Sequence, residues 1–318
     1  MPNESRLKHF PISFFAITMG LTGFSVALQR AEKLFGWQAG AGQLFSWLAA
    51  CVFLVMLGMY ALKALRYGED VRKDLRHPIK LSFFPAISIT LLLLSIAFHQ
   101  TSQQLSLLLL FTGAPLHLFF TLFVLSTWIR QNYFEIQHMN PSWFIPVVGN
   151  ILVPIAAVEH GYIEIAWFYF SIGIVFWLVL MSIVFNRIIF HHPLPEKLMP
   201  TFFILIAPPA LGFIAYVKLT GGIDSFARVL YYFALFIVLL LIALSRQFYG
   251  IKFYTSWWAY SFPVAAISIA SMLMYSQTRN GFFLAVSYLL LTAITTIIAL
   301  LTFKTLQAVS RREICVED

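Results

Sequence analysis

The sequence predicts an all-α integral membrane protein with ten transmembrane helices, five of which gather around one axis. Composition argues against a soluble protein, because 60% of the 318 residues are hydrophobic and only 11% are charged, whereas soluble domains carry roughly a quarter charged residues. The hydrophobic residues fall into ten stretches, each long enough to cross a hydrocarbon core of about 30 Å. Every second stretch also contains a proline near its start or middle.

The ten predicted spans are joined by short loops and form a single transmembrane domain over residues 1–318. They cover residues 9–29, 44–65, 79–99, 106–129, 142–161, 162–186, 198–219, 226–245, 254–275 and 281–305. Only the polar sequence Glu159-His160-Gly161 separates the fifth span from the sixth. The first stretch is long and lacks a small-x-small cleavage site, so we expect it to remain as a span and not to be removed as a signal peptide.

The basic residues predict that both termini are cytoplasmic. In that orientation, 16 of the 21 lysines and arginines lie on the cytoplasmic side, and the net charge of +8 follows mostly from this asymmetry. Cytoplasmic loops of membrane proteins are enriched in Lys and Arg. The basic segment 63–80 is therefore interpreted as a topology signal in contact with anionic membrane lipid, and we expect no nucleic acid partner.

The prolines of the odd-numbered spans predict a repeated structure. They are Pro11, Pro85, Pro146, Pro208, Pro209 and Pro263. A proline removes one backbone hydrogen bond and clashes with the preceding turn, so we expect a kink at each. In hydrocarbon the freed carbonyl needs a partner, which favours a kinked helix that faces protein or a watery cavity. The regular positions indicate five helical hairpins whose odd-numbered helices line a pore, although prolines are common in transmembrane helices generally and Pro115 and Pro154 break the pattern.

The predicted pore carries no charge along its middle. Glu159 and Lys218 lie only at the ends of odd-numbered spans, so neither the acidic rings of cation channels nor the relays of proton-coupled pumps are evident. His117 is the ionisable residue deepest in a span; we expect it to bond to a neighbouring helix, with a proton relay as the alternative. Gly20, Gly23 and other small residues permit close approach of helices.

Other site types are not expected. The spans contain no paired acids, no nucleophile with a base and no histidine cluster, so we expect neither an enzyme nor a cofactor. Cys51 and Cys315 should lie at different depths, which argues against a disulfide, and they are too sparse for a metal site. Trp257, Trp258 and Tyr260 are expected to form a belt at the membrane interface.

Three segments resemble the tellurite-resistance/dicarboxylate transporter family, which includes bacterial TehA proteins and plant guard-cell slow anion channels. The most specific is Trp257-Trp258-Ala259-Tyr260-Ser261-Phe262-Pro263, which is similar to the ninth-helix motif of that family. The other two are Phe10-Pro11-Ile12-Ser13-Phe14-Phe15, followed by Met19-Gly20-Leu21, and Arg72-Lys73-Asp74-Leu75-Arg76-His77-Pro78. The resemblance covers nearly the whole chain.

The resemblance implies five hairpins in a quasi-fivefold arrangement, with odd-numbered helices around a central pore and even-numbered helices outside. It also implies a homotrimer with one pore per subunit, in the bacterial inner (plasma) membrane, and a gate formed by the ring of Phe262. We therefore expect an anion channel for small monovalent inorganic anions. The alternative is a secondary transporter or exporter of C4-dicarboxylate, sulfite or tellurite-type oxyanions.

Overall fold

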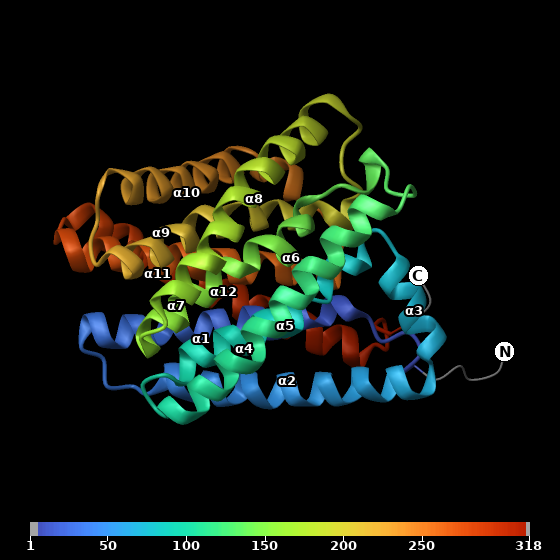
Figure 1. Ribbon diagram of the computed structural model, residues 1–318, viewed down its shortest axis with the longest axis horizontal. Helices are drawn as coiled ribbons and strands as arrows, with labels where there is room; N and C mark the ends of the chain where they lie inside the picture. Colours follow the sequence, from blue (N-terminus) through green and yellow to red (C-terminus); the bar gives the residue numbers. More distant parts are fainter. Residues whose placement is uncertain (1–5, 316–318) are drawn as a thin grey trace.

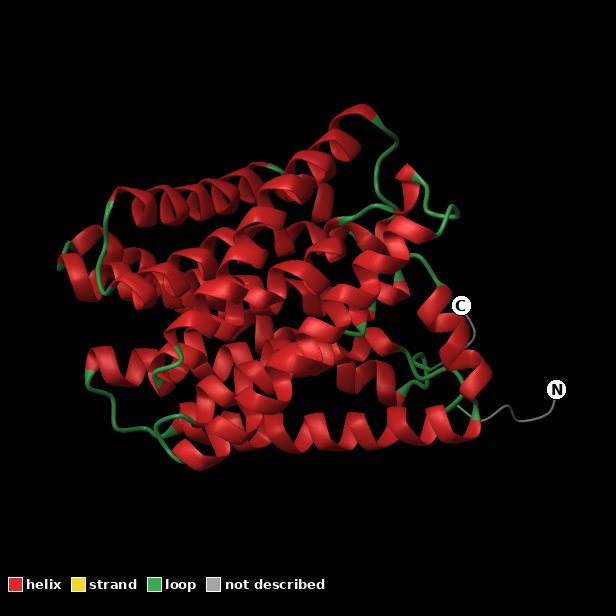
Figure 2. Ribbon diagram, viewed as in Figure 1, coloured by secondary structure: helices red, strands yellow, loops and turns green. Residues whose placement is uncertain are grey.

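The protein is a bundle of long helices, and residues 6–315 are described in the computed structural model (Figure 1). Figure 2 shows helices and connecting loops, and no strand occurs among these residues. The α-helices are α1 (Phe15–Phe35), α2 (Ala41–Arg66), α3 (Gly68–Arg76), α4 (Ala86–Phe98), α5 (Gln103–Arg130), α6 (Ile145–Val148), α7 (Leu152–Ala157), α8 (Ile163–Phe190), α9 (Ala207–Thr220), α10 (Ser225–Ala243), α11 (Ser261–Thr278) and α12 (Gly281–Ser310).

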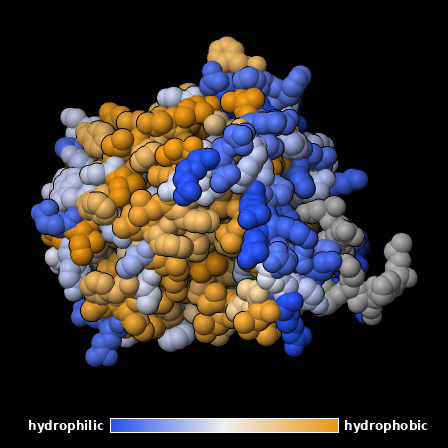
Figure 3. Space-filling model, turned by 45° about the vertical axis from the view of Figure 1, so that its right-hand side comes forward, coloured by the Kyte–Doolittle hydropathy of each residue, from blue (hydrophilic) through white to orange (hydrophobic). Residues whose placement is uncertain are grey.

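Ten helical segments within the described residues are long and apolar enough to cross a membrane, which confirms the predicted all-α membrane fold. They are Ile12–Phe35, Ala41–Arg66, Lys80–Phe98, Gln103–Arg130, Pro141–His160, Ile163–Phe190, Glu196–Thr220, Ser225–Ala243, Thr255–Thr278 and Gly281–Ser310. Figure 3 shows a broad hydrophobic surface between hydrophilic ends, the distribution expected where acyl chains surround a protein.

Several helices run past the predicted limits of their spans. Helix α1 continues to Phe35, where residue 29 had been expected, and α12 continues to Ser310, five residues beyond the expected end. Hydropathy indicates where a span leaves the hydrocarbon core of the membrane. The helix itself can continue beyond that point until a capping residue ends it. For α1 that cap is Gly36, whose φ of 72° is in the left-handed region that glycine adopts without strain.

The basic segment between the second and third spans contains a helix that was not predicted from the sequence. Helix α3 has Glu69 and Asp70 in its first turn and Lys73 and Arg76 in its last. This order places negative charge at the positive end of the helix dipole and positive charge at the negative end, which stabilises a short helix.

The ten spans form two layers. In the most hydrophobic 18-residue window of each odd-numbered span, 72–94% of residues are buried, against 22–39% in the even-numbered spans. We call the first group the inner spans and the second the outer spans. Side chains such as Leu54, Phe119 and Leu239 on the outer spans are more than half exposed, as expected for helices that face lipid.

Contacts among the inner spans close into a ring. Helix α1 packs against α4, α4 against α7, α7 against α9, α9 against α11, and α11 against α1 again. Each inner span also packs against the outer span that follows it in the chain, for example α1 on α2 and α11 on α12. Every inner span therefore has two inner neighbours and an outer partner.

Candidate functional site

Each inner span changes from a 3₁₀ segment to an α-helix along its length. The 3₁₀ segments Ile12–Phe14, Lys80–Phe83, Pro141–Phe144, Glu196–Ile206 and Thr255–Tyr260 precede α1, α4, α6, α9 and α11. Such stretches inside a helix often mark functional regions.

The predicted kink prolines, except Pro11, lie at these changes of helix type. Pro11 precedes its 3₁₀ segment and Pro85 immediately precedes α4, whereas Pro146, Pro208, Pro209 and Pro263 are in the first turn of an α-helix. Proline is tolerated there because first-turn N–H groups have no partner within the α-helix. All except Pro11 are buried, and Pro11 is half-buried. A bend at each proline stays a prediction.

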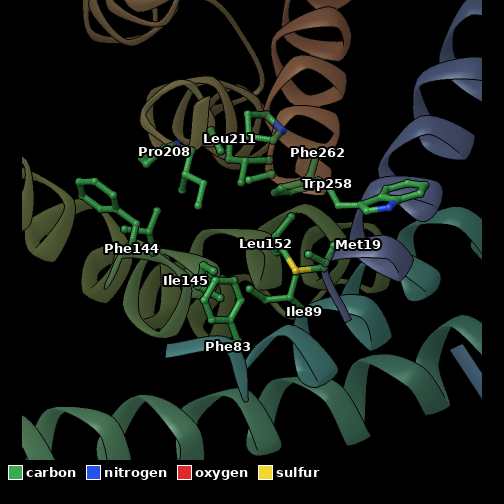
Figure 4. A pocket seen from close by; sticks show the side chains of 17 residues that line it. Met19, Phe83, Ile89, Phe144, Ile145, Leu152, Pro208, Leu211, Trp258 and Phe262 are labelled. Carbon is green, nitrogen blue, oxygen red and sulfur yellow. The ribbon is translucent and has the colours of Figure 1, made fainter. Parts of the chain in front are cut away.

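An apolar cavity of about 60 Å³ lies where the five inner spans meet (Figure 4). Every inner span contributes to its wall, and no residue of an outer span does. No charged or histidine side chain is among the lining residues, which are Ala16, Met19, Phe83, Ile89, Phe144, Ile145, Val148, Gly149, Leu152, Ile204, Ala207, Pro208, Leu211, Trp258, Ala259, Phe262 and Pro263. The wall is therefore uncharged, in agreement with the absence of charge predicted along the middle of these spans.

Phe262 is the second residue of α11, and its ring lines this cavity. In Figure 4 it lies beside Leu211 of α9, with Ile89 of α4 across the cavity. The ring is 9% exposed. It rests against Gly23 of α1, where a Cβ atom would lie only 2.9 Å from Cδ2 of Phe262. Glycine at position 23 thus makes the room that the ring occupies.

A buried polar cluster supports the inner span Pro141–His160. Thr121 of α5 donates a hydrogen bond to the carbonyl of Pro146 (2.7 Å), and Asn150 Nδ2 donates to the carbonyl of Val147 (2.7 Å). Helix α6 gives way to a 3₁₀ turn at Gly149, so these side chains bind carbonyls next to the change in backbone pattern. Asn150 thus bonds the backbone directly beside Pro146.

His117 of α5 bonds to the neighbouring inner helix, as predicted. Its Nδ1 lies 2.9 Å from Oγ of Ser88, and that hydroxyl donates to the carbonyl of Pro85 at 2.8 Å. Ser88 therefore accepts the hydrogen bond from Nδ1. The other ring nitrogen, Nε2, has no partner among the described residues and faces Gly149, where a Cβ atom would lie 2.6 Å away.

One end of the inner ring carries charged residues that sequence reasoning did not bring together. Lys218 of α9 forms an ion pair with Glu159, and Nε2 of His99 lies 3.6 Å from the same carboxylate. Arg30 of α1 interacts electrostatically with Glu159 and donates to Ser276 of α11 at 3.1 Å. Their positions in the sequence could have indicated this cluster, because each of these residues lies at or near the C-terminal end of a different inner span.

The predicted interfacial belt is wrong for Trp258. Its side chain is 2% exposed, lines the cavity, and donates from Nε1 to the hydroxyl of Thr305 at 3.0 Å. A tryptophan near the start of a span resembles an interfacial anchor in sequence, but the direction of its side chain depends on neighbouring helices. The two cysteines are free thiols, as expected: Cys51 is exposed on α2 and Cys315 is half-buried beyond α12.

Comparison with known proteins finds similarity to plant S-type anion channels. The chain is 29% identical to the S-type anion channel SLAH2 of Arabidopsis thaliana, over 98% of this chain and 62% of the relative. It is also 29% identical to the guard cell S-type anion channel SLAC1 of the same plant, over 89% of this chain and 53% of the relative. The chain thus spans little more than half the length of these plant relatives.

A bacterial relative is matched over most of both chains. The tellurite resistance protein TehA homolog of Haemophilus influenzae is 25% identical, over 84% of this chain and 83% of the relative. The family described as SLAC1, voltage-dependent anion channel, matches residues 9–306. That range contains all five inner spans in full and the residues lining the cavity, and it establishes that this chain belongs to the SLAC1 family.

Proposed function

We propose that this protein is an anion channel in which small monovalent anions pass along the axis of the inner ring and Phe262 closes the path. The observation that carries this proposal is the cavity whose wall comes from all five inner spans and contains no charged side chain. In a quasi-fivefold arrangement of hairpins, this cavity lies on the common axis. A wall without fixed charge binds ions weakly, which permits rapid passage and selects partly by the cost of dehydration.

The α-helical parts of four inner spans begin at the cavity. Ala16, Ile145, Ala207 and Phe262 are the first or second residues of α1, α6, α9 and α11, and all line the cavity. Carbonyl groups of the preceding 3₁₀ segments accept the first N–H of each of these helices. The partial positive charge of a free helix N-terminus is therefore not what favours an anion at this position.

The charged end of the inner ring favours anions over cations. Arg30, Lys33 and Lys218 interact with Glu159, and when Glu32 of α1 is included these three cations still exceed the two carboxylates by one. A net positive entrance raises the local concentration of anions and their rate of entry. The positive charge lies at the entrance and not in the cavity, so an anion is attracted without being held at the narrowest point.

Electrical recording from the purified protein in planar bilayers tests the proposal. We expect a current that varies linearly with voltage and whose reversal potential follows the gradient of chloride or nitrate when the cation is exchanged. Transport that occurs only when a proton gradient is present contradicts the channel and favours the secondary transporter of oxyanions.

The His117→Gln variant separates the two mechanisms further. His117 is the titratable residue buried deepest between spans, so a proton-coupled mechanism has few other candidates. For a channel we expect the anion current of this variant to stay within about twofold of wild type, since polar substitutions away from a pore wall have small effects. Loss of anion transport in a variant that remains folded by circular dichroism supports coupled transport instead.

Gly23→Ala is expected to raise the resting anion current by about threefold or more. The new methyl group would lie 2.9 Å from Cδ2 of Phe262, so the ring must leave its present position, and crowding of this kind typically costs about 1–3 kcal/mol. Displacement weakens the closed position relative to open ones. The same substitution in a Phe262→Ala background should leave the current unchanged. An equal effect in both backgrounds contradicts a role for this contact in gating.

We propose further that three copies assemble with one pore each and that both termini face the cytoplasm of a bacterial cell. The even number of spans places both ends of the chain on one side, and Cys315 lies close enough to Arg6 and Lys63 to interact electrostatically. Mass measurement of the detergent-solubilised protein tests the trimer. Labelling of Cys315 in intact and opened cells tests the orientation.

A further inference from the structure

A second, larger cleft lies on the outside of the bundle, between α3 and the end of α5. Its volume is about 540 Å³. Three arginines line it: Arg72 and Arg76 of α3, and Arg130 at the last position of α5. Ser126, Thr127 and Tyr133 add hydroxyl groups to the same wall. From this geometry we propose that the cleft binds the phosphate of an anionic phospholipid.

The cleft has an excess of positive charge that the protein does not neutralise. Its lining contains no aspartate or glutamate. Arg72 pairs with Glu69 on the exposed face of α3, but Arg76 and Arg130 have no ion-pair partner among the described residues. Guanidinium groups bind phosphate oxygens through paired hydrogen bonds. Two unpaired arginines at one cleft are therefore a suitable site for a phosphate group.

Helix α3, from which two of the arginines extend, is anchored to the rest of the bundle by a buried carboxylate. Asp74, on the same helix, is buried and pairs with Lys63 of α2 at 2.6 Å and with Lys80 at 3.2 Å. The remaining acidic residue of the helix, Asp70, pairs with Lys73. Asp70 and Asp74 are thus engaged with lysines outside the lining, whereas Glu69 pairs with Arg72 of the lining. An anchored helix loses less conformational entropy on binding than a mobile segment does.

The apolar side of the cleft distinguishes a lipid from a soluble phosphate. Phe123 lines the cleft and is 37% exposed on the outer span α5. Its ring is stacked on that of Phe119, one turn further into the membrane-spanning part, with centroids 6.2 Å apart. Leu122 and Phe119 are also exposed there. The cleft is therefore continuous with a lipid-facing apolar strip along which an acyl chain can lie, while Figure 3 shows hydrophilic residues gathered next to the hydrophobic surface.

Lipid binding can be measured in detergent by adding phosphatidylglycerol or phosphatidylcholine to the full-length protein and following bound lipid by native mass spectrometry. We expect phosphatidylglycerol to bind and phosphatidylcholine to bind far more weakly. In Arg76→Gln/Arg130→Gln we expect affinity for phosphatidylglycerol to fall by roughly 30-fold, from the usual contribution of each basic residue near an anionic surface. The charge-conserving Arg76→Lys/Arg130→Lys variant should bind more tightly than the glutamine variant and less tightly than wild type, because lysine keeps the charge but cannot form the paired hydrogen bonds of a guanidinium group. Its retained binding shows that the site can be altered without unfolding.

The matched control is Arg246→Gln/Lys252→Gln, which removes the same charge from exposed positions between α10 and α11. It should leave binding within about twofold of wild type, as expected for surface positions away from a site. An equal loss in this control means that diffuse charge attracts the lipid, and the proposal is then wrong. The proposal is also wrong if inorganic phosphate or glycerol phosphate displaces phosphatidylglycerol at similar concentrations, because the site then recognises a free anion.

Discussion

Phe262→Ala is expected to raise anion conductance by about a hundredfold. The ring lines an apolar cavity whose wall comes from the five inner spans, so removing it widens the path and lets an anion keep more of its hydration shell. Stripping hydration from a polar or charged group costs several kcal/mol or more, and each 1.4 kcal/mol removed from a barrier increases a rate about tenfold. Single-channel and whole-bilayer currents of wild type and variant, recorded in the same anion, measure the difference.

Phe203→Ala is the matched control for this experiment. Phe203 belongs to the neighbouring inner span, packs against Tyr260 with ring centroids 4.6 Å apart, and does not line the cavity. Phe203→Ala removes a phenyl ring from an inner span, as Phe262→Ala does, and we expect conductance to stay close to the wild-type value. If both variants conduct alike, the effect of Phe262 reflects loosened packing and the ring is not a gate.

Lys63→Met is expected to lower the unfolding temperature in mild detergent by roughly 6–10 °C, the shift expected from a loss of about 3–5 kcal/mol in a chain of this size. The ammonium group of Lys63 lies 2.6 Å from Asp74 and donates to the carbonyl of Phe10 at 2.9 Å. Both side chains are almost fully buried, at 4% and 8% exposure. Methionine keeps the shape of the side chain but leaves a buried carboxylate with Lys80 as its remaining cation.

Lys73→Met gives the comparison on an exposed pair. Lys73 pairs with Asp70 at 3.2 Å, and its side chain is 77% exposed. Exposed pairs contribute about 0–1 kcal/mol, so this variant should unfold within about 2 °C of wild type. Similar losses in the two variants contradict a structural role for the buried pair. A large loss for Lys63 alone supports a connection from α2 and α3 to Phe10, immediately before the first inner span.

The general architecture could be predicted because it depends on short-range properties of the chain. Ten hydrophobic stretches identify ten helices, and a backbone that cannot be hydrated in hydrocarbon must form helices there. The prolines of alternate spans also distinguished the spans that form the inner layer from those of the outer layer. Their positions at 3₁₀-to-α changes were not predicted, because a proline in the first turn of a helix and a proline at a kink look alike in sequence.

The candidate site was predicted only in part. Phe262 was identified through a resemblance, and the structure places its ring in the cavity against Gly23. Trp258 was assigned to the wrong environment, since sequence does not show which way a side chain points. The group formed by Arg30, His99, Glu159 and Lys218 was missed, although each residue lies at or near the C-terminal end of an inner span.

By itself, the sequence determined the number of spans, the lack of charge in the middle of the inner ones, and the alternation of helices with and without an interrupting proline. These properties follow from hydrophobicity and backbone chemistry, which act within one or two helical turns. Only the tertiary structure decided that five inner spans close into a ring around an apolar cavity, that Gly23 makes room for Phe262, and that three arginines line one cleft. These contacts depend on how helices far apart in the chain pack against one another.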